Sequence, residues 1–238
     1  ATHIAPMRPP CQDGVLVANG NLYWGPWMCG CQLSLYGNIC LSPAGASLPR
    51  GAAVYDDALR EIAPGAEPPP LEIAPGDWPS YRGGNARNDV ARREIPGQAT
   101  LAWTAQESPH ALPTAPVAAG GLVFLADRTG AVHAYDSKGE AVWKTYVGGP
   151  VYYPPAVAHD RLYVGAADGR VYALAARTGK PLWSFRAAPR NRMIRVFERL
   201  ISRWPVAGGV VVEGDTVYAA AGITHYDGTY VVALDALT

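Results

Sequence analysis

The cysteines are the most reactive side chains of this 238-residue chain, and all of them lie within its first forty residues. They are Cys11, Cys29, Cys31 and Cys40. Such clustering favours an oxidising compartment, where a disulfide from Cys11 to Cys29 or Cys31 would form. Reduced thiols remain an alternative. A metal site at Cys11, Cys29 and Cys31 is another, although soft-metal sites normally use four ligands.

The other residue types indicate no recognisable catalytic centre. The five histidines are not accompanied by a nucleophile elbow, and no Cys-x-x-Cys-His sequence could attach a c-type haem. The formal net charge is zero, which argues against binding nucleic acid or a membrane surface through bulk charge. A run of about 18 apolar residues, long enough to span a membrane, does not occur. We therefore expect any binding residues to lie on loops of a folded scaffold.

The segment from Pro154 to Phe185 indicates how that scaffold is built. Its sequence, PPAVAHDRLYVGAADGRVYALAARTGKPLWSF, contains four short apolar runs separated by polar or glycine-bearing turns. This pattern predicts a four-stranded antiparallel meander, with strands A to D in chain order. Residues 113–146 repeat the same order of strand and turn signals.

Further copies establish the architecture. One begins at Pro205, and the run from Val15 to Tyr23 matches the A–B hairpin near the start of the chain. Trp103, Trp143 and Trp183 follow one another at steps of 40 residues. Four strands in a period of about 40 residues are typical of a β-propeller blade. We expect each of these tryptophans to have a structural role, buried between neighbouring sheets.

The closing part of each copy resembles the PQQ-like propellers, whose blades end in Ala-x-Asp-x-x-Thr-Gly-x-x-x-Trp. Ala173 to Trp183 keeps the spacing, with Ala175 in the Asp position, and Ala134 to Trp143 is one residue short. Ala233 to Thr238 resembles the start of another copy, and Asp77 to Gly83 is similar to the lead-in of large secreted bacterial members. This superfamily includes the quinoprotein dehydrogenases and a non-enzymatic lipoprotein of the outer-membrane β-barrel assembly machine.

The resemblance implies the blade and not the active site. Quinoprotein dehydrogenases hold a calcium ion with acidic and amide side chains, use a catalytic Asp, and often have a disulfide between adjacent cysteines. No adjacent cysteines occur here, and no motif position matches the calcium ligands. We therefore predict no cofactor, and we keep PQQ with calcium as the alternative.

The repeats suggest three regions. Residues 1–45 would form strands A to C of a first blade, with the cysteine cluster. A turn at Asn19-Gly20 would place Cys11 opposite Met28 or Cys29. Residues 46–99 would be a Pro/Gly-rich insertion or linker, and residues 100–238 would form further blades, the last one truncated.

The Pro-rich region leaves two alternatives open. It contains one helical candidate, Ala53 to Ile62, where Val54, Ala58, Leu59 and Ile62 would share a face. Leu101 to Thr104 would then resume the repeat as a D strand. The region is either an insertion between strands C and D of the first blade, which we favour, or a link to a new lead-in at Trp78.

Antiparallel tracing of a blade places its B-to-C and D-to-A connections on one side. Because long loops on a rigid scaffold collect binding residues, this side is where we expect a ligand or partner. Its candidate residues are Tyr153, Arg203, Trp204, His225 and Asp227.

The connection from Arg186 to Arg203 is unusual in composition, with six arginines and one acidic residue, Glu198. The spacing of Met193, Ile194, Phe197, Leu200 and Ile201 predicts a short amphipathic helix. This helix would be either a lid packed on the propeller or a cationic site for an anion or partner near the central channel.

We therefore expect an all-β propeller of four-stranded blades with an incomplete ring of about four. Its open edges would be covered by the remaining blades of a longer precursor or by another chain. The favoured function is a non-catalytic scaffold or partner-binding module of a periplasmic or secreted bacterial protein. The alternative is a fragment of a PQQ-dependent or other cofactor-bearing oxidoreductase. Neither nucleic acid nor a transmembrane segment is expected.

Overall fold

The computed structural model describes residues 16–18, 21–24, 39–41, 60–62, 67–88, 97–105, 111–196, 198–224 and 227–238. Contacts divide the chain into two compact units, one formed by Ala1–Ala53 with Arg192–Ile201 and the other by Val54–Asn191 with Ser202–Thr238. In the described ranges the regular elements are β-strands and one 3-10 turn, η2 (Tyr81–Gly83). No helix in these ranges is long and apolar enough to cross a membrane.

The first unit contains the predicted hairpin near the start of the chain. Its sheet has the order β1-β2-β3, and these strands are Leu16–Ala18, Asn21–Trp24 and Ile39–Leu41. Leu16 pairs with Tyr23 and Ala18 with Asn21, so β1 and β2 form an antiparallel pair as predicted for the A–B hairpin. Cys11, Cys29 and Cys31 lie outside the described residues, and the disulfide stays a prediction.

A two-stranded hairpin replaces the helix predicted between Arg186 and Arg203. It consists of β13 (Met193–Val196) and β14 (Arg199–Ser202). Along β13, exposed and half-buried side chains alternate, which is the period of a strand and not of a helix. Glu198 has φ +66° in the short turn, a left-handed conformation that ends any helical run. The helix prediction is therefore wrong.

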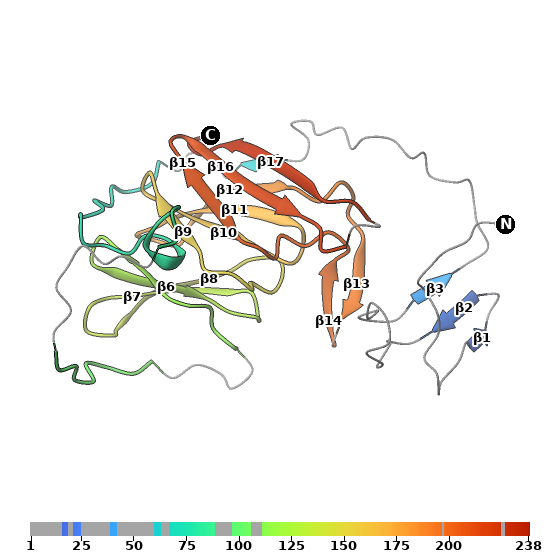
Figure 1. Ribbon diagram of the computed structural model, residues 1–238, viewed down its shortest axis with the longest axis horizontal. Helices are drawn as coiled ribbons and strands as arrows, with labels where there is room; N and C mark the ends of the chain where they lie inside the picture. Colours follow the sequence, from blue (N-terminus) through green and yellow to red (C-terminus); the bar gives the residue numbers. More distant parts are fainter. Residues whose placement is uncertain are drawn as a thin grey trace. The chain divides into compact units, whose positions relative to one another are not determined.

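The second unit contains three antiparallel sheets (Figure 1). The first has the order β5 (Val117–Ala119), β6 (Leu122–Ala126), β7 (Ala131–Tyr135) and β8 (Ala141–Tyr146). The second has β9 (Ala156–Ala158), β10 (Arg161–Gly165), β11 (Arg170–Ala175) and β12 (Pro181–Arg186). The third has β15 (Val210–Glu213), β16 (Thr216–Ala221) and β17 (Tyr230–Asp235). Strand β9 contacts both β5 and β15, so the sheets follow one another as blades of an incomplete ring.

The two four-stranded sheets share their irregularities as well as their order. The register of β7 on β8 shifts between Ala134 and Tyr135, and that of β11 on β12 shifts between Ala173 and Leu174. Ala134 and Ala173 hold the same place in the repeat and pair with Trp143 and Trp183. A bulge at the same position of each blade fixes where the tryptophan side chain points.

The tryptophans contact the turn of the following repeat through a glycine. A β-carbon on Gly179 would lie 2.4 Å from the Trp143 ring, and one on Gly139 would lie 2.6 Å from the Trp103 ring. Both glycines have positive φ, +68° and +84°. Trp183 is buried as predicted, whereas Trp103 and Trp143 are half-buried. Full burial of an indole removes roughly 200 Å² from water and contributes about 5 kcal/mol before entropy, so the half-buried rings contribute less. Trp103 makes this contact from an irregular segment, so the D strand predicted at Leu101 to Thr104 is wrong.

The indole nitrogens of Trp143 and Trp183 differ in their hydrogen bonding. Trp143 Nε1 donates to the Ala176 carbonyl in the next sheet, 2.9 Å away. The corresponding carbonyl beyond Trp183 is that of Ala236, but it accepts the Tyr163 hydroxyl at 2.9 Å. Among the described residues Trp183 Nε1 is buried without a hydrogen-bond partner.

The lead-in segment from Asp77 crosses the inner strands of all three blades. Trp78 forms an antiparallel bridge with Ala118 on β5, and the Pro79 carbonyl accepts the Val157 amide of β9 at 2.8 Å. Farther along, Asn85 Nδ2 donates to the Val212 carbonyl of β15 at 2.7 Å. One short segment therefore ties three inner edges together, and both alternatives for the Pro-rich region stay predictions.

The Pro-rich region also reaches an outer edge. Strand β4 (Arg60–Ile62) adds to β12 as a fifth, antiparallel strand. The helix predicted from Ala53 to Ile62 is therefore wrong over its last three residues, while its other residues lie outside the described ranges. The open edge of β12 offers backbone partners that the local periodicity could not take into account.

The glycine beneath Trp143 yields a stability prediction. Gly179→Ala should lower the free energy of unfolding by about 3 kcal/mol, because it combines left-handed strain with a clash against the indole. Gly121→Ala is the matched control, since Gly121 has φ +79° but a β-carbon there would meet nothing within 4 Å. It should cost only about 1 kcal/mol. Equal shifts of the two urea midpoints would contradict the clash.

Candidate functional site

The B-to-C turns and D-to-A loops of the second unit meet at one end of the blades, as predicted. The Val147 amide after β8 donates to the backbone carbonyl of Gly130, and the Val151 amide donates to the backbone carbonyl of Asp127. Between the blades, the Ala167 amide donates to the Pro150 carbonyl. We call this surface the loop face. It comprises turns 127–130 and 166–169, residues 222–224 and 227–228 after β16, and loops 147–155 and 202–209.

The turn after β6 contains a buried carboxylate with four donors. Asp127 Oδ1 accepts the Thr129 amide at 2.7 Å, the Thr129 hydroxyl at 2.5 Å and the Ala131 amide at 3.2 Å. Its Oδ2 lies 3.1 Å from His133 Nε2, and both side chains are almost fully buried. Burial raises the pKa of Asp127, but these hydrogen bonds outweigh it and hold the pKa below its ordinary value.

The turn after β10 also contains a carboxylate, Asp168, but with different hydrogen-bond partners. Asp168 accepts the Tyr172 hydroxyl and, at 3.1 Å, the Arg170 amide. Burial raises the pKa of Asp168 above its ordinary value, and the hydrogen bonds offset only part of that shift. The Tyr172 hydroxyl also accepts the Gly148 amide at 3.1 Å, which joins the neighbouring loop to this turn. A β-carbon on Gly148 would lie 2.2 Å from Asp168 Oδ2, so the loop needs glycine here.

Three of the predicted site residues meet at the third blade. The Arg203 guanidinium forms an ion pair with Asp227 and lies 5.6 Å from the centre of the Trp204 ring. Trp204 Nε1 donates to the Asp227 carbonyl at 2.7 Å. Trp204 is only 8% exposed and belongs to the core between β12 and β16, so its ring contributes packing and little accessible surface.

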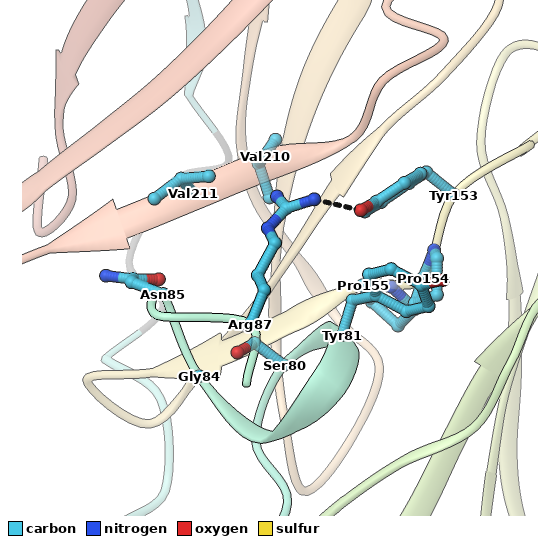
Figure 2. A pocket seen from close by; sticks show the side chains of 10 residues that line it. All are labelled: Ser80, Tyr81, Gly84, Asn85, Arg87, Tyr153, Pro154, Pro155, Val210 and Val211. Carbon is cyan, nitrogen blue, oxygen red and sulfur yellow. Dashed lines mark hydrogen bonds between the residues drawn. The ribbon is translucent and has the colours of Figure 1, made fainter. Parts of the chain in front are cut away.

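Tyr153 lies at a different place, in a shallow pocket beside the inner strands (Figure 2). Arg87 reaches across this pocket, donates to the Tyr153 hydroxyl and lies 5.2 Å from that ring and 5.8 Å from the Tyr81 ring. The two tyrosine rings are edge to face at 4.9 Å. The arginine therefore already fills the position that a cationic ligand would take.

One of the predicted loop residues cannot be placed. His225 lies outside the described residues, as do the three cysteines of the proposed metal site. Within the described ranges no group of three or more His, Cys, Asp or Glu side chains could hold a metal ion. Calcium requires six to eight oxygen ligands, whereas Asp127, Asp168 and Asp227 are each bonded within their own blade. The described residues therefore do not fit the calcium site of a quinoprotein.

The sequence did not single out three residues of this surface. Asp127 and His133 sit in the repeat where the next blade has Ala166 and Tyr172, and that difference between copies was the available signal. Arg87 gave no signal, because its partners Tyr81 and Tyr153 approach it only in the folded chain.

Comparison with protein families supports the repeat assignment. The family model described as "Outer membrane protein assembly factor BamB" matches residues 90–238. A protein of that name from Nitrosomonas eutropha is 30% identical over 121 residues, which cover 51% of this chain and 26% of the relative. One from Burkholderia pseudomallei is 31% identical over 119 residues, or 50% of this chain and 28% of the relative. The chain thus spans about a quarter of the length of these curated relatives.

Solved structures of two dehydrogenases share the fold. The quinohemoprotein alcohol dehydrogenase from Comamonas testosteroni has a TM-score of 0.55 and 26% identity, covering 68% of this chain and 26% of that one. A europium-containing methanol dehydrogenase has a TM-score of 0.53 and 19% identity, covering 71% and 31%. The latter likeness concerns the fold alone.

The buried carboxylate yields a pH prediction. Because the folded-state pKa of Asp127 is depressed, its stabilisation is present above the unfolded pKa of about 3.9 and is lost as the pH falls through the folded value. Asp127→Asn should therefore lower stability in urea at pH 6, and the deficit should shrink towards pH 3. Glu140→Gln, at an exposed side chain, should show no such change. A deficit that is constant with pH would contradict a role for the ionised carboxylate.

Proposed function

The chain belongs to the PQQ-like propeller family described as outer membrane protein assembly factor BamB, and on that premise we propose that it is a non-catalytic, partner-binding part of a bacterial envelope protein. Its relatives are named for assembly in the outer membrane. We place the chain on the periplasmic or secreted side of the envelope, and its partners are protein chains or further blades of the same protein. The loop face would bind them.

This proposal rests on one observation: every described carboxylate of the loop face is already hydrogen-bonded or ion-paired within the protein. Asp127, Asp168 and Asp227 are each bonded to side chains of their own blade or loop. A carboxylate committed in this way cannot bind a metal or accept a substrate proton without breaking those bonds. The same bonds make the face rigid, and a rigid surface loses little conformational entropy when a protein binds it.

The accessible part of the face has suitable chemistry for a protein partner. Tyr152 is 38% exposed, and the Arg128 guanidinium lies 5.5 Å from the centre of its ring. Leu112, 53% exposed, follows Ala111, whose carbonyl accepts the Arg128 amide at 2.7 Å. Tyrosine and arginine are enriched among the residues that dominate protein interfaces. We therefore assign the first contact to Tyr152 and Arg128.

The likeness to a quinohemoprotein alcohol dehydrogenase supports a second candidate, a fragment of a PQQ-dependent oxidoreductase. In that case the residues for PQQ and calcium would have to lie outside the described ranges, since those inside do not form a ligand group. The candidate is therefore the weaker of the two, and cofactor binding separates them directly.

Photocross-linking in the bacterial host tests the partner site. With the photoreactive p-benzoylphenylalanine in place of Tyr152, we expect an ultraviolet-dependent adduct with a protein of the cell envelope, identified by mass spectrometry. The same substitution at Val142, 45% exposed on the outer strand β8, should give no such adduct. Arg128→Glu should reduce the Tyr152 adduct at least tenfold. Identical adducts from both positions, or none from Tyr152, would contradict the assignment.

A cofactor titration tests the alternative. Purified protein mixed with equimolar PQQ and calcium chloride should elute from a desalting column without quinone absorbance. Bovine serum albumin gives the background for non-specific retention. Stoichiometric retention that requires calcium would overturn the non-catalytic proposal and favour the dehydrogenase fragment.

A further inference from the structure

The outer edge of β12 is already paired with a short strand from a distant part of the chain. We propose that this edge is a strand-addition site for an extended, acidic segment of a partner protein, and that β4 occupies the site within the chain until such a segment replaces it. The edge belongs to the outer strand of a blade, and its paired residues Trp183 to Phe185 are not part of the loop face. The inference therefore does not rest on the function proposed above.

Among the described residues, pairing covers half of the edge. Strand β12 has six residues, Pro181–Arg186, and the described residues of β4 pair with Trp183, Ser184 and Phe185. All three residues of β4 are exposed. An edge strand presents a row of amides and carbonyls that pair with any extended chain of suitable register. A partner segment longer than β4 could use the positions that β4 leaves unpaired.

The side chains of the edge select a carboxylate. Arg170, on the neighbouring strand β11, donates through Nη1 to Ser184 Oγ at 2.9 Å and through Nη2 to Glu61 Oε1 at 2.7 Å. The Ser184 hydroxyl also lies 3.3 Å from Glu61 Oε2. Arg170 and Ser184 belong to the blade itself, so the receptor half of this contact exists without β4. The Arg170 guanidinium and the Ser184 hydroxyl together can bind the carboxylate of one acidic side chain opposite Ser184.

The occupant is held loosely in comparison with its receptor. The Glu61 side chain is 69% exposed, whereas the Arg170 side chain is 23% exposed. Ile62, opposite Trp183, is 55% exposed and buries little apolar surface. The sequence after Ile62 has prolines at 64 and 68–70, and proline cannot donate to a strand ladder. Exchange for a longer strand therefore costs few interactions.

One atom at the end of the edge lacks a partner. Arg186 Nε is buried and makes no hydrogen bond among the described residues. Arg186 follows Phe185, the last position paired with β4.

A peptide experiment on the full 238-residue chain tests the exchange. The variant carries both Glu61→Pro and Ile62→Pro. Only one of two consecutive amides in a strand faces the neighbouring strand, and proline lacks the amide hydrogen, so the double change removes the donor that faces β12. A fluorescein-labelled peptide of residues 57–65 should bind this variant at least tenfold more tightly than the unaltered chain, by fluorescence anisotropy. Amides of Trp183 to Phe185 should exchange faster in the variant and recover protection when the peptide is added.

Single substitutions in the peptide and in the protein test the contact between the glutamate and Arg170. A peptide in which the glutamate at position 61 is replaced by lysine should bind the opened variant at least tenfold more weakly, because the lysine meets Arg170. Adding Arg170→Ala to the opened variant should weaken the original peptide similarly. Arg177→Ala, at an exposed arginine that donates to the Pro70 carbonyl, should leave peptide binding unchanged.

Two results would overturn the proposal. The first is the absence of saturable peptide binding to the opened variant; the second is equal affinity for the glutamate and lysine peptides. If the double-proline variant does not fold, as judged by near-ultraviolet circular dichroism, Glu61→Lys in the full chain provides the opened form. That variant must then bind the glutamate peptide more tightly than the unaltered chain does.

Discussion

The fold depends on the contact between an indole and a left-handed glycine in the next repeat. Trp143 lies against Gly179 and Trp103 against Gly139, and no side chain fits between ring and backbone at either place. The contact links one repeat to the turn that closes the following one, and a bulge in the adjacent strand pair directs the Trp143 ring. Because each repeat needs one tryptophan and one glycine at fixed offsets, the spacing of 40 residues visible in the sequence follows from this packing.

Repetition is also the reason why so much of the fold could be predicted. Strand order, antiparallel pairing and the shared end of the B-to-C and D-to-A connections all follow from the pattern inside one copy. Segments outside the copies were predicted poorly. Ala53 to Ile62 and Met193 to Ile201 both have apolar spacing that suits a helix, yet Arg60–Ile62 and Met193–Val196 form strands. The edge of β12 decides the first case, and pairing within the hairpin decides the second, so tertiary context overrides local periodicity.

The candidate site, like the fold, was predicted only in part. Arg203, Trp204 and Asp227 were expected on one surface, and they lie together because two loops of the third blade converge. The sequence could not indicate that Trp204 would be buried or that Tyr153 would pair with Arg87, since both facts depend on packing between distant segments. The buried Asp127–His133 pair left a signal only as a difference between copies, since the next blade has a tyrosine bonded to a different Asp.

The competition for the Ala236 carbonyl has a consequence for how such repeats diverge. In one blade a phenylalanine, Phe124, leaves the neighbouring carbonyl to Trp143, whereas in the next a tyrosine, Tyr163, takes the carbonyl and Trp183 Nε1 remains unsatisfied. The aromatic residue on strand B of one copy therefore determines the hydrogen bond available to the indole on strand D. A copy moved to another place in the array would therefore meet a neighbouring carbonyl that its own strand B residue and indole share differently.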